Sequence, residues 1–122
     1  MNKKILIVDD DSSILEVLKL ISEMAGYKVQ TATSGEEALN IIKKDLPDLM
    51  VLDMMLPGIS GKQVCKKIKN NPKTKKIPIV MISANIKDAD FRRDPWAEEF
   101  LEKPLDMDKF LNVIAEQLKK LK

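Results

Sequence analysis

The chain has 122 residues, of which 44% are hydrophobic and 33% are charged. This length suits one domain with a real core and is too short for two domains. A formal net charge of +2 is too small for a nucleic-acid or membrane binder that relies on bulk charge. One Cys excludes an internal disulfide and a cysteine-rich zinc site, and the absence of His excludes Ser-His-Asp and Cys-His catalysis. The first apolar run is too short for a signal peptide or a membrane span, so we expect a single cytoplasmic domain over residues 1–122.

Three apolar runs predict buried strands, at Ile5–Val8, Leu49–Leu52 and Pro78–Ile82. None of them alternates with polar residues, so both faces of each strand should be covered, as in a parallel sheet between helices. Tyr27–Ala32 and Glu99–Glu102 are weaker strand candidates.

Helical patterns lie between these runs. Apolar residues recur at helical spacing over residues 14–25, where Ser13–Glu16 has the pattern of a capping box and Gly26 that of a C-terminal stop. Further helices are expected after the capping box Ser34–Glu37, over Gly61–Asn70, and after an N-cap at Asp106. Strand and helix alternate along the chain, which predicts an α/β domain with a parallel sheet.

Polar residues follow the predicted strands directly: Asp9 and Asp10, then Asp53, Ser83 and Lys103. The carboxyl ends of parallel strands share one edge of a sheet, where ligands bind. Crowded carboxylates repel one another unless a cation neutralises them, and an oxygen-only site suits Mg²⁺. A metal beside Asp53, with an ammonium and a hydroxyl opposite, can hold a phosphoryl group, and the carboxylate can act as the nucleophile that forms an acyl phosphate.

These residues stand in motifs that resemble the receiver domain of bacterial and archaeal two-component response regulators. The resemblance extends over essentially the whole chain. It rests on four segments in this order and spacing: residues 5–11, 47–58, 77–84 and 100–104.

The resemblance implies a site for phosphoryl transfer. Asp53 matches the phosphorylated aspartate, which takes its phosphoryl group with Mg²⁺ from a phosphohistidine of a sensor histidine kinase or a histidine phosphotransfer protein. Asp10 matches a direct metal ligand and Asp9 a nearby acid that acts partly through water, while Asp53 and the backbone carbonyl of Met55 complete the protein's share of the metal shell. Lys103 matches the phosphate-binding lysine, and its peptide bond to the following proline is expected to be cis.

The same resemblance implies a switch and a topology. Ser83 matches the switch hydroxyl and Phe100 the switch aromatic, which together alter the binding of a downstream target that the sequence does not name. The implied fold is a flavodoxin-like, doubly wound five-stranded sheet in the order 2-1-3-4-5, with five helices. No direct contact with nucleic acid or membrane is expected.

One segment departs from the family pattern. Asp94-Pro95-Trp96-Ala97 stands where receivers usually carry a Gly-Ala pair before the fifth strand, and the proline prevents a helix from passing Asp94. We therefore expect a short or irregular fourth helix over residues 87–93. Met55 and Asn85 match the positions that tune the lifetime of the phosphate, and because Met55 cannot orient a water, we predict a long-lived acyl phosphate.

Two other functions fit some of these residues. A phosphatase of the haloacid dehalogenase type also uses Asp, Lys, Ser or Thr and Mg²⁺, but its nucleophile stands in an Asp-x-Asp motif after the first strand, whereas here an acidic pair comes first. The other alternative is a pseudo-receiver that is never phosphorylated and serves as a protein scaffold. The sequence fits equally a stand-alone regulator and the receiver of a longer one.

Overall fold

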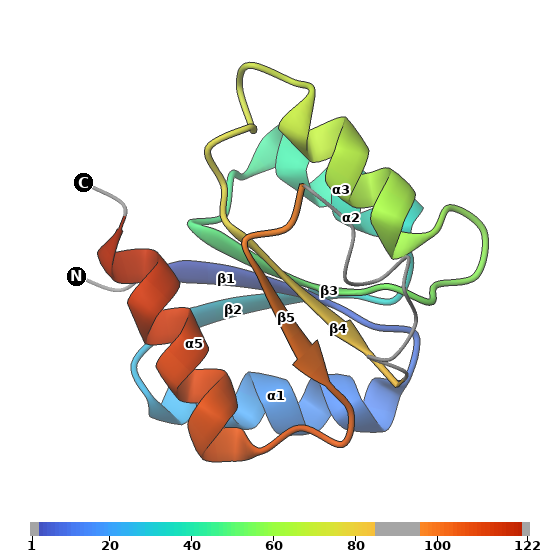
Figure 1. Ribbon diagram of the computed structural model, residues 1–122. Coiled ribbons are helices and arrows are strands. Elements are labelled where there is room, and N and C mark those ends of the chain that lie inside the picture. The colour runs from blue at the N-terminus through green and yellow to red at the C-terminus, as the bar shows by residue number, and fades with distance from the viewer. Residues whose placement is uncertain (1–2, 85–95, 121–122) are drawn as a thin grey trace.

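The computed structural model describes residues 3–84 and 96–120, which form a five-stranded parallel sheet with helices on both faces (Figure 1). The strands are β1 (Lys4–Val8), β2 (Lys28–Ala32), β3 (Leu49–Asp53), β4 (Ile79–Ser83) and β5 (Glu99–Glu102). The described helices are α1 (Ser12–Met24), α2 (Gly35–Lys44), α3 (Gly61–Lys69) and α5 (Met107–Lys119). The strand order is β2-β1-β3-β4-β5, which confirms the expected topology. The short helix expected over 87–93 lies outside the described residues.

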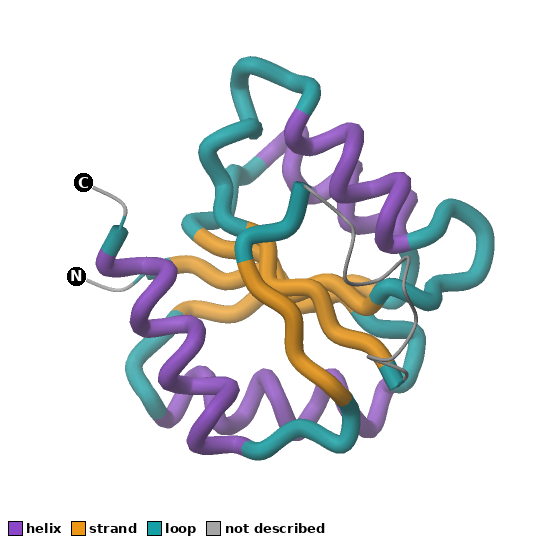
Figure 2. Tube along the Cα trace, viewed as in Figure 1, coloured by secondary structure: helices purple, strands orange, loops and turns teal. Residues whose placement is uncertain are grey.

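Two of these helices cover each face of the sheet, α1 and α5 on one side and α2 and α3 on the other (Figures 1 and 2). Successive strand residues point to opposite faces, so each strand feeds two cores. In β1, Ile5 and Ile7 join the core under α1 and α5, whereas Leu6 and Val8 join the core under α2 and α3. Every residue of β3 and β4 is buried, which explains why their apolar runs show no alternation.

The helix ends follow local capping chemistry, with one correction to the sequence prediction. Asp11, not Ser13, caps α1: its side chain accepts hydrogen bonds from the backbone N–H groups of Ser13 (2.9 Å) and Ile14 (3.3 Å). The capping box predicted over Ser13–Glu16 is wrong because the acid two residues earlier already satisfies the first free N–H groups. Gly26 ends the helix segment at a φ of 99°, a backbone conformation that glycine adopts without steric cost.

The other predicted caps are largely confirmed. The Ser34 hydroxyl accepts from the Glu37 N–H at 3.1 Å, but the Glu37 carboxylate accepts from Thr33 and not from Ser34, so only half of that capping box forms. A full box, which the sequence analysis missed, joins Ser60 and Gln63 at the start of α3. None of the described helices is both long enough and apolar enough to cross a bilayer.

A buried lysine ties the end of α3 to the strands beside it. The side chain of Lys69 is 8% exposed, and its Nζ donates to the backbone carbonyl of Ile77 at 2.7 Å and contacts the Glu98 carboxylate at 2.8 Å. Glu98 also accepts from the backbone N–H of Ile79 at 2.8 Å. This Lys69–Glu98 clamp fixes where β4 begins and how the chain enters β5.

Candidate functional site

The sheet register brings the predicted site residues to one edge. Val8 pairs with Leu52 across β1 and β3, so Asp9, the next residue, lies beside the end of β3 where Asp53 stands. On the other side, Asp53 pairs with Ile82, and Ser83 follows at the end of β4. The Lys103 N–H donates to the Ser83 carbonyl at 2.8 Å, which places Lys103 directly after β5 at the same edge.

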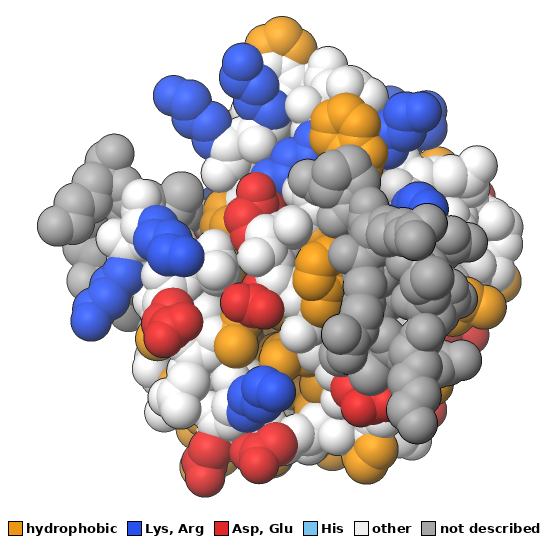
Figure 3. Space-filling model, in the orientation of Figure 1, with side chains coloured by type: hydrophobic (Ala, Val, Ile, Leu, Met, Phe, Trp, Pro, Cys, Tyr) orange, Lys and Arg blue, Asp and Glu red, His pale blue; other side chains and the backbone are white. Residues whose placement is uncertain are grey.

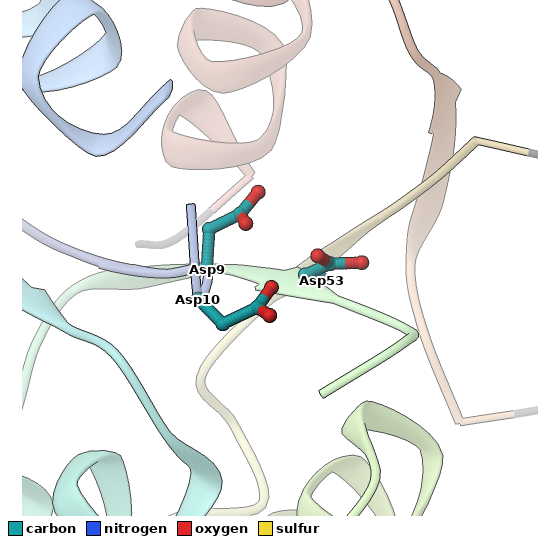
Figure 4. Close-up of side chains that lie close together, drawn as sticks. All are labelled: Asp9, Asp10 and Asp53. Atoms are coloured by element: carbon teal, nitrogen blue, oxygen red, sulfur yellow. The ribbon is translucent and has the colours of Figure 1, made fainter. Parts of the chain in front are cut away.

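Three carboxylates meet there. Asp9 and Asp10 come from the end of β1 and Asp53 from the end of β3 (Figure 4), and one oxygen from each lies within 4.8 Å of the others. Asp9 is 0% exposed and Asp53 is 3% exposed, whereas Asp10 is exposed. Two buried acids and one exposed acid therefore lie close enough together for a single cation to contact all three.

Lys103 is the cation of the site. Its Nζ lies 2.9 Å from Asp9 Oδ2 and 3.1 Å from Asp53 Oδ2. The Lys103–Pro104 peptide bond is cis, as the resemblance implied. Asp9 Oδ2 is buried and accepts no aligned hydrogen bond from any described residue, and its charge is balanced by the ion pair with Lys103.

Asp53 is held on both of its oxygens. Oδ1 accepts the backbone N–H of Met55 at 3.0 Å, while Oδ2 accepts from Lys103. Burial raises the pKa of Asp53 and the charge of Asp9 adds to this, outweighing the opposite effects of the Met55 N–H and of Lys103. Burial alone would lower the pKa of Lys103, but its pairing with Asp9 and Asp53 raises it, so the ammonium stays charged.

The carboxylate set fits a hard divalent cation. Three acids against one ammonium leave uncompensated negative charge in a largely buried site, and a buried carboxylate oxygen without an aligned donor is a ready ligand. The ligand atoms that this cluster offers are carboxylate oxygens, which Mg²⁺ prefers. The side chain of Met55 is 68% exposed and turns away from the core, so only its backbone is in a position to take part.

The two residues expected to form the switch lie on neighbouring strands. Ser83 is 3% exposed at the end of β4, and Phe100 is half-buried in β5, where it packs against the core under α2 and α3. Phe100 pairs with Met81, two residues before Ser83. Asn85 lies outside the described residues.

One glycine at the site went unnoticed in the sequence. A Cβ on Gly61 would lie 2.1 Å from the backbone oxygen of Asp53, and the Gly61 N–H donates to the Met54 carbonyl at 3.1 Å. The first residue of α3 thus packs directly against the backbone of Asp53. Only glycine fits there, because any other residue would place a Cβ in the contact. A glycine in the first turn of a helix, directly after a capping serine, was the signal that could have revealed this contact.

The family model for the response regulator receiver domain matches residues 5–115. The chain belongs to this family. The family read from the motifs is thereby confirmed, and with it a place in two-component signalling. Receiver domains are signalling modules rather than conventional enzymes.

Similar proteins include the alkaline phosphatase synthesis transcriptional regulatory protein PhoP of Bacillus subtilis, 43% identical over 108 residues, which cover 85% of this chain and 43% of PhoP. Response regulator PleD of Caulobacter vibrioides is 39% identical over 112 residues, covering 87% of this chain and 24% of PleD. The chain thus spans less than half the length of either relative. The expectation of no contact with nucleic acid finds no support here, because similar proteins include regulators named as transcriptional or DNA-binding.

Solved receiver structures are also similar over nearly all of the chain. The response regulator receiver domain protein (CheY-like) from Methanospirillum hungatei has a TM-score of 0.89 at 29% identity and covers 98% of this chain and 96% of its own. The response regulator TrrA from Thermotoga maritima, solved in complex with Mg²⁺-BeF, has a TM-score of 0.85 at 34% identity, covering 94% of this chain and 98% of its own.

Proposed function

We propose that this receiver domain takes a phosphoryl group onto Asp53, with Mg²⁺, from a phosphohistidine of a sensor histidine kinase or a histidine phosphotransfer protein. One observation carries the proposal: a buried carboxylate with an ammonium on one oxygen and a backbone N–H on the other, beside two further acids. The similarity to TrrA, solved with Mg²⁺-BeF, supports the choice of metal.

The residues divide the work by position. Asp10, Asp9, Asp53 and the backbone carbonyl of Met55 would hold Mg²⁺, which supplies positive charge for the phosphoryl oxygens. Lys103 supplies a second positive charge, and its contacts with Asp9 and Asp53 keep it at the site. The Met55 N–H holds the Asp53 carboxylate in place through Oδ1.

Transfer needs one bond to form and one to break. A carboxylate oxygen of Asp53 bonds to phosphorus while the P–N bond of the donor breaks, and the electron pair of that bond stays on the imidazole nitrogen of the donor. The product is an acyl phosphate on Asp53. These 122 residues contain no His, so the phosphohistidine that donates the phosphoryl group lies outside them.

Phosphorylation would then move Ser83 and Phe100. The Ser83 hydroxyl, one residue beyond the strand partner of Asp53, would donate a hydrogen bond to a phosphoryl oxygen. Phe100, half-buried on the neighbouring strand β5, would turn inward and change the surface that a downstream target binds. We propose that residues 1–122 act as one such switching domain in the cytoplasm.

The exposed Met55 side chain supports a long-lived phosphate. It is 68% exposed next to Asp53 and carries no group that orients an attacking water by hydrogen bonding. Hydrolysis of the acyl phosphate within seconds at neutral pH would contradict this part of the proposal.

The test is phosphorylation by acetyl phosphate with Mg²⁺, followed by intact mass. We expect one added phosphoryl group in the wild type and none in Asp53→Asn. When a chelator removes the metal before the phosphodonor is added, we expect no phosphorylation of the wild type. Asp108→Asn, an exposed acid on α5, is the matched control and should still be phosphorylated. Absence of phosphorylation from this donor and also from sensor kinases would favour the scaffold alternative.

A further inference from the structure

A dense group of lysines lies on α3 and in the segment that follows it. Residues 61–78 contain seven lysines and no Asp or Glu, although the whole chain has a net charge of only +2, so the rest of the chain is net acidic. Six of these lysines are exposed, and the exposed Lys43 and Lys44 end α2 beside them. None of these eight side chains forms an ion pair with a described residue. Figure 3 shows lysines gathered over this end of the molecule.

Between α2 and α3 these lysines border a groove of about 260 Å³, which we call the lysine groove. Leu39, Ile42 and Ile68 form its apolar floor. Lys43 and Lys67 stand on opposite sides, one from each helix, and Asn71 and Thr74 complete the lining. The groove therefore joins an apolar surface to unneutralised positive charge.

The dipoles of α2 and α3 explain the positions of only some of these lysines. Lysines in the last turns of α2 and α3 favour the negative ends of those helices. Lys73, Lys75 and Lys76 follow α3 in the turn before β4 and gain nothing from its dipole. Their mutual repulsion opposes folding unless salt or a partner screens it, so an anionic partner would stabilise this face.

The residues that line the groove favour an acidic protein segment over a nucleic acid as the anionic partner. Neither α2 nor residues 61–78 contain an arginine or an aromatic residue, the side chains that read or stack on nucleic-acid bases. An apolar floor makes no favourable contact with a phosphate backbone. It can instead bury the apolar side chains of an acidic amphipathic segment. We propose that the lysine groove binds an acidic segment of a partner protein, with leucine-like side chains on the floor and carboxylates at Lys43 and Lys67.

The groove lies away from the phosphorylation site. Both α2 and α3 start at the carboxyl edge of the sheet, where Gly61 contacts the backbone of Asp53, and run back toward the opposite edge. Lys43 and Lys67 stand in or near their last turns. A partner in the groove therefore leaves the phosphodonor free to reach Asp53, and the inference does not depend on phosphorylation.

The test is an NMR titration of the ¹⁵N-labelled chain at low salt with three probes. The first is a short helical peptide of glutamates and leucines with the leucines on one face, the second replaces every leucine by serine, and the third is an oligothymidylate of equal charge. We expect saturable shifts at Leu39, Lys67 and Thr74 with the leucine peptide. Its affinity should exceed that of both other probes by about tenfold or more, as the burial of one leucine side chain implies.

Two double variants distinguish binding in the lysine groove from non-specific attraction to the positive charge of the protein. Lys43→Gln/Lys67→Gln should weaken the leucine peptide by about tenfold, while Lys19→Gln/Lys119→Gln removes the same charge from other exposed positions and should change affinity less than about twofold. Equal or tighter binding of the oligothymidylate overturns the proposal in favour of nucleic acid. If the two variant pairs weaken binding equally, or if about 1 mM peptide causes no shifts, the lysine groove is not a binding site and the proposal is refuted.

Discussion

Replacing Asp53 by Asn should stabilise the metal-free protein at neutral pH. Asp53 is 3% exposed, and it repels Asp9 and Asp10 over at most 4.8 Å while Lys103 attracts it over 3.1 Å. At an effective dielectric constant of about 20, the two repulsions come to roughly 7 kcal/mol and the attraction to about 5 kcal/mol. The difference of about 2 kcal/mol favours the neutral amide, and relief of carboxylate desolvation acts in the same direction.

The pH dependence of this effect has a definite sign. Because burial raises the pKa of Asp53 in the folded state above the ordinary value of 3.8, ionisation of Asp53 opposes folding. The advantage of Asp53→Asn is therefore greatest above the folded pKa and disappears as the pH falls through that value toward 3.8.

Urea unfolding in chelator, at pH 7 and again near pH 4, measures both effects. Asp108→Asn changes an exposed acid outside the site, in the first turn of α5, and is the control. It should not stabilise the protein, and any loss of unfolding free energy should stay below about 1 kcal/mol. Added Mg²⁺ should stabilise the wild type more than Asp53→Asn, because it binds the folded site. A lower free energy of unfolding for Asp53→Asn at pH 7 in chelator would refute the electrostatic reasoning.

Four other substitutions test the site and the Lys69–Glu98 clamp. Lys103→Met should slow phosphorylation by acetyl phosphate about 100-fold or more, because the phosphoryl group loses a positive charge; phosphorylation at the wild-type rate would contradict that role. Gly61→Ala should cost about 2–3 kcal/mol of unfolding free energy, since its Cβ would lie 2.1 Å from the Asp53 backbone oxygen, and an unchanged thermal midpoint would contradict the close contact. Lys69→Met should cost about 2–3 kcal/mol by leaving the Ile77 carbonyl and the Glu98 carboxylate without their cation. Glu98→Gln, which keeps hydrogen-bonding capacity toward Ile79, should cost less in chemical denaturation, and a larger loss than Lys69→Met would contradict the clamp.

Much of the fold was predictable because the buried strands leave a strong local signal. The runs in β1, β3 and β4 are apolar throughout, since helices cover both faces, and the predicted Glu99–Glu102 matches β5. Pro78–Ile82 was one residue early because Pro78 precedes the first residue of the ladder. The strand order came from the family motifs, because periodicity alone does not say which parallel strands are neighbours.

The site was predictable where each polar residue directly follows a strand. Asp9, Asp10, Asp53 and Lys103 meet as the sheet edge implies. What the sequence concealed depends on contacts between distant segments. The clamp joins residues 29 positions apart, and no local pattern distinguishes Lys69 from the exposed lysines around it.

The contact at Gly61 was concealed in a different way. A glycine in a first helical turn carries a local signal, but its meaning depends on how closely α3 approaches the end of β3. The cap of α1 was predicted at Ser13 and not at Asp11, because the serines after Asp11 form an equally good capping pattern in the sequence.

The most direct measurement is the identification of the phosphorylated carboxylate itself. Borohydride reduces an aspartyl phosphate to homoserine, so peptide mass spectrometry after reduction reports which of the three clustered acids carried the phosphoryl group. We expect homoserine at position 53 alone, and only in samples that contained Mg²⁺ and phosphodonor. Homoserine at position 9 or 10, or a phosphorylated protein that yields none at position 53, would contradict the assignment of Asp53 as the phosphoacceptor.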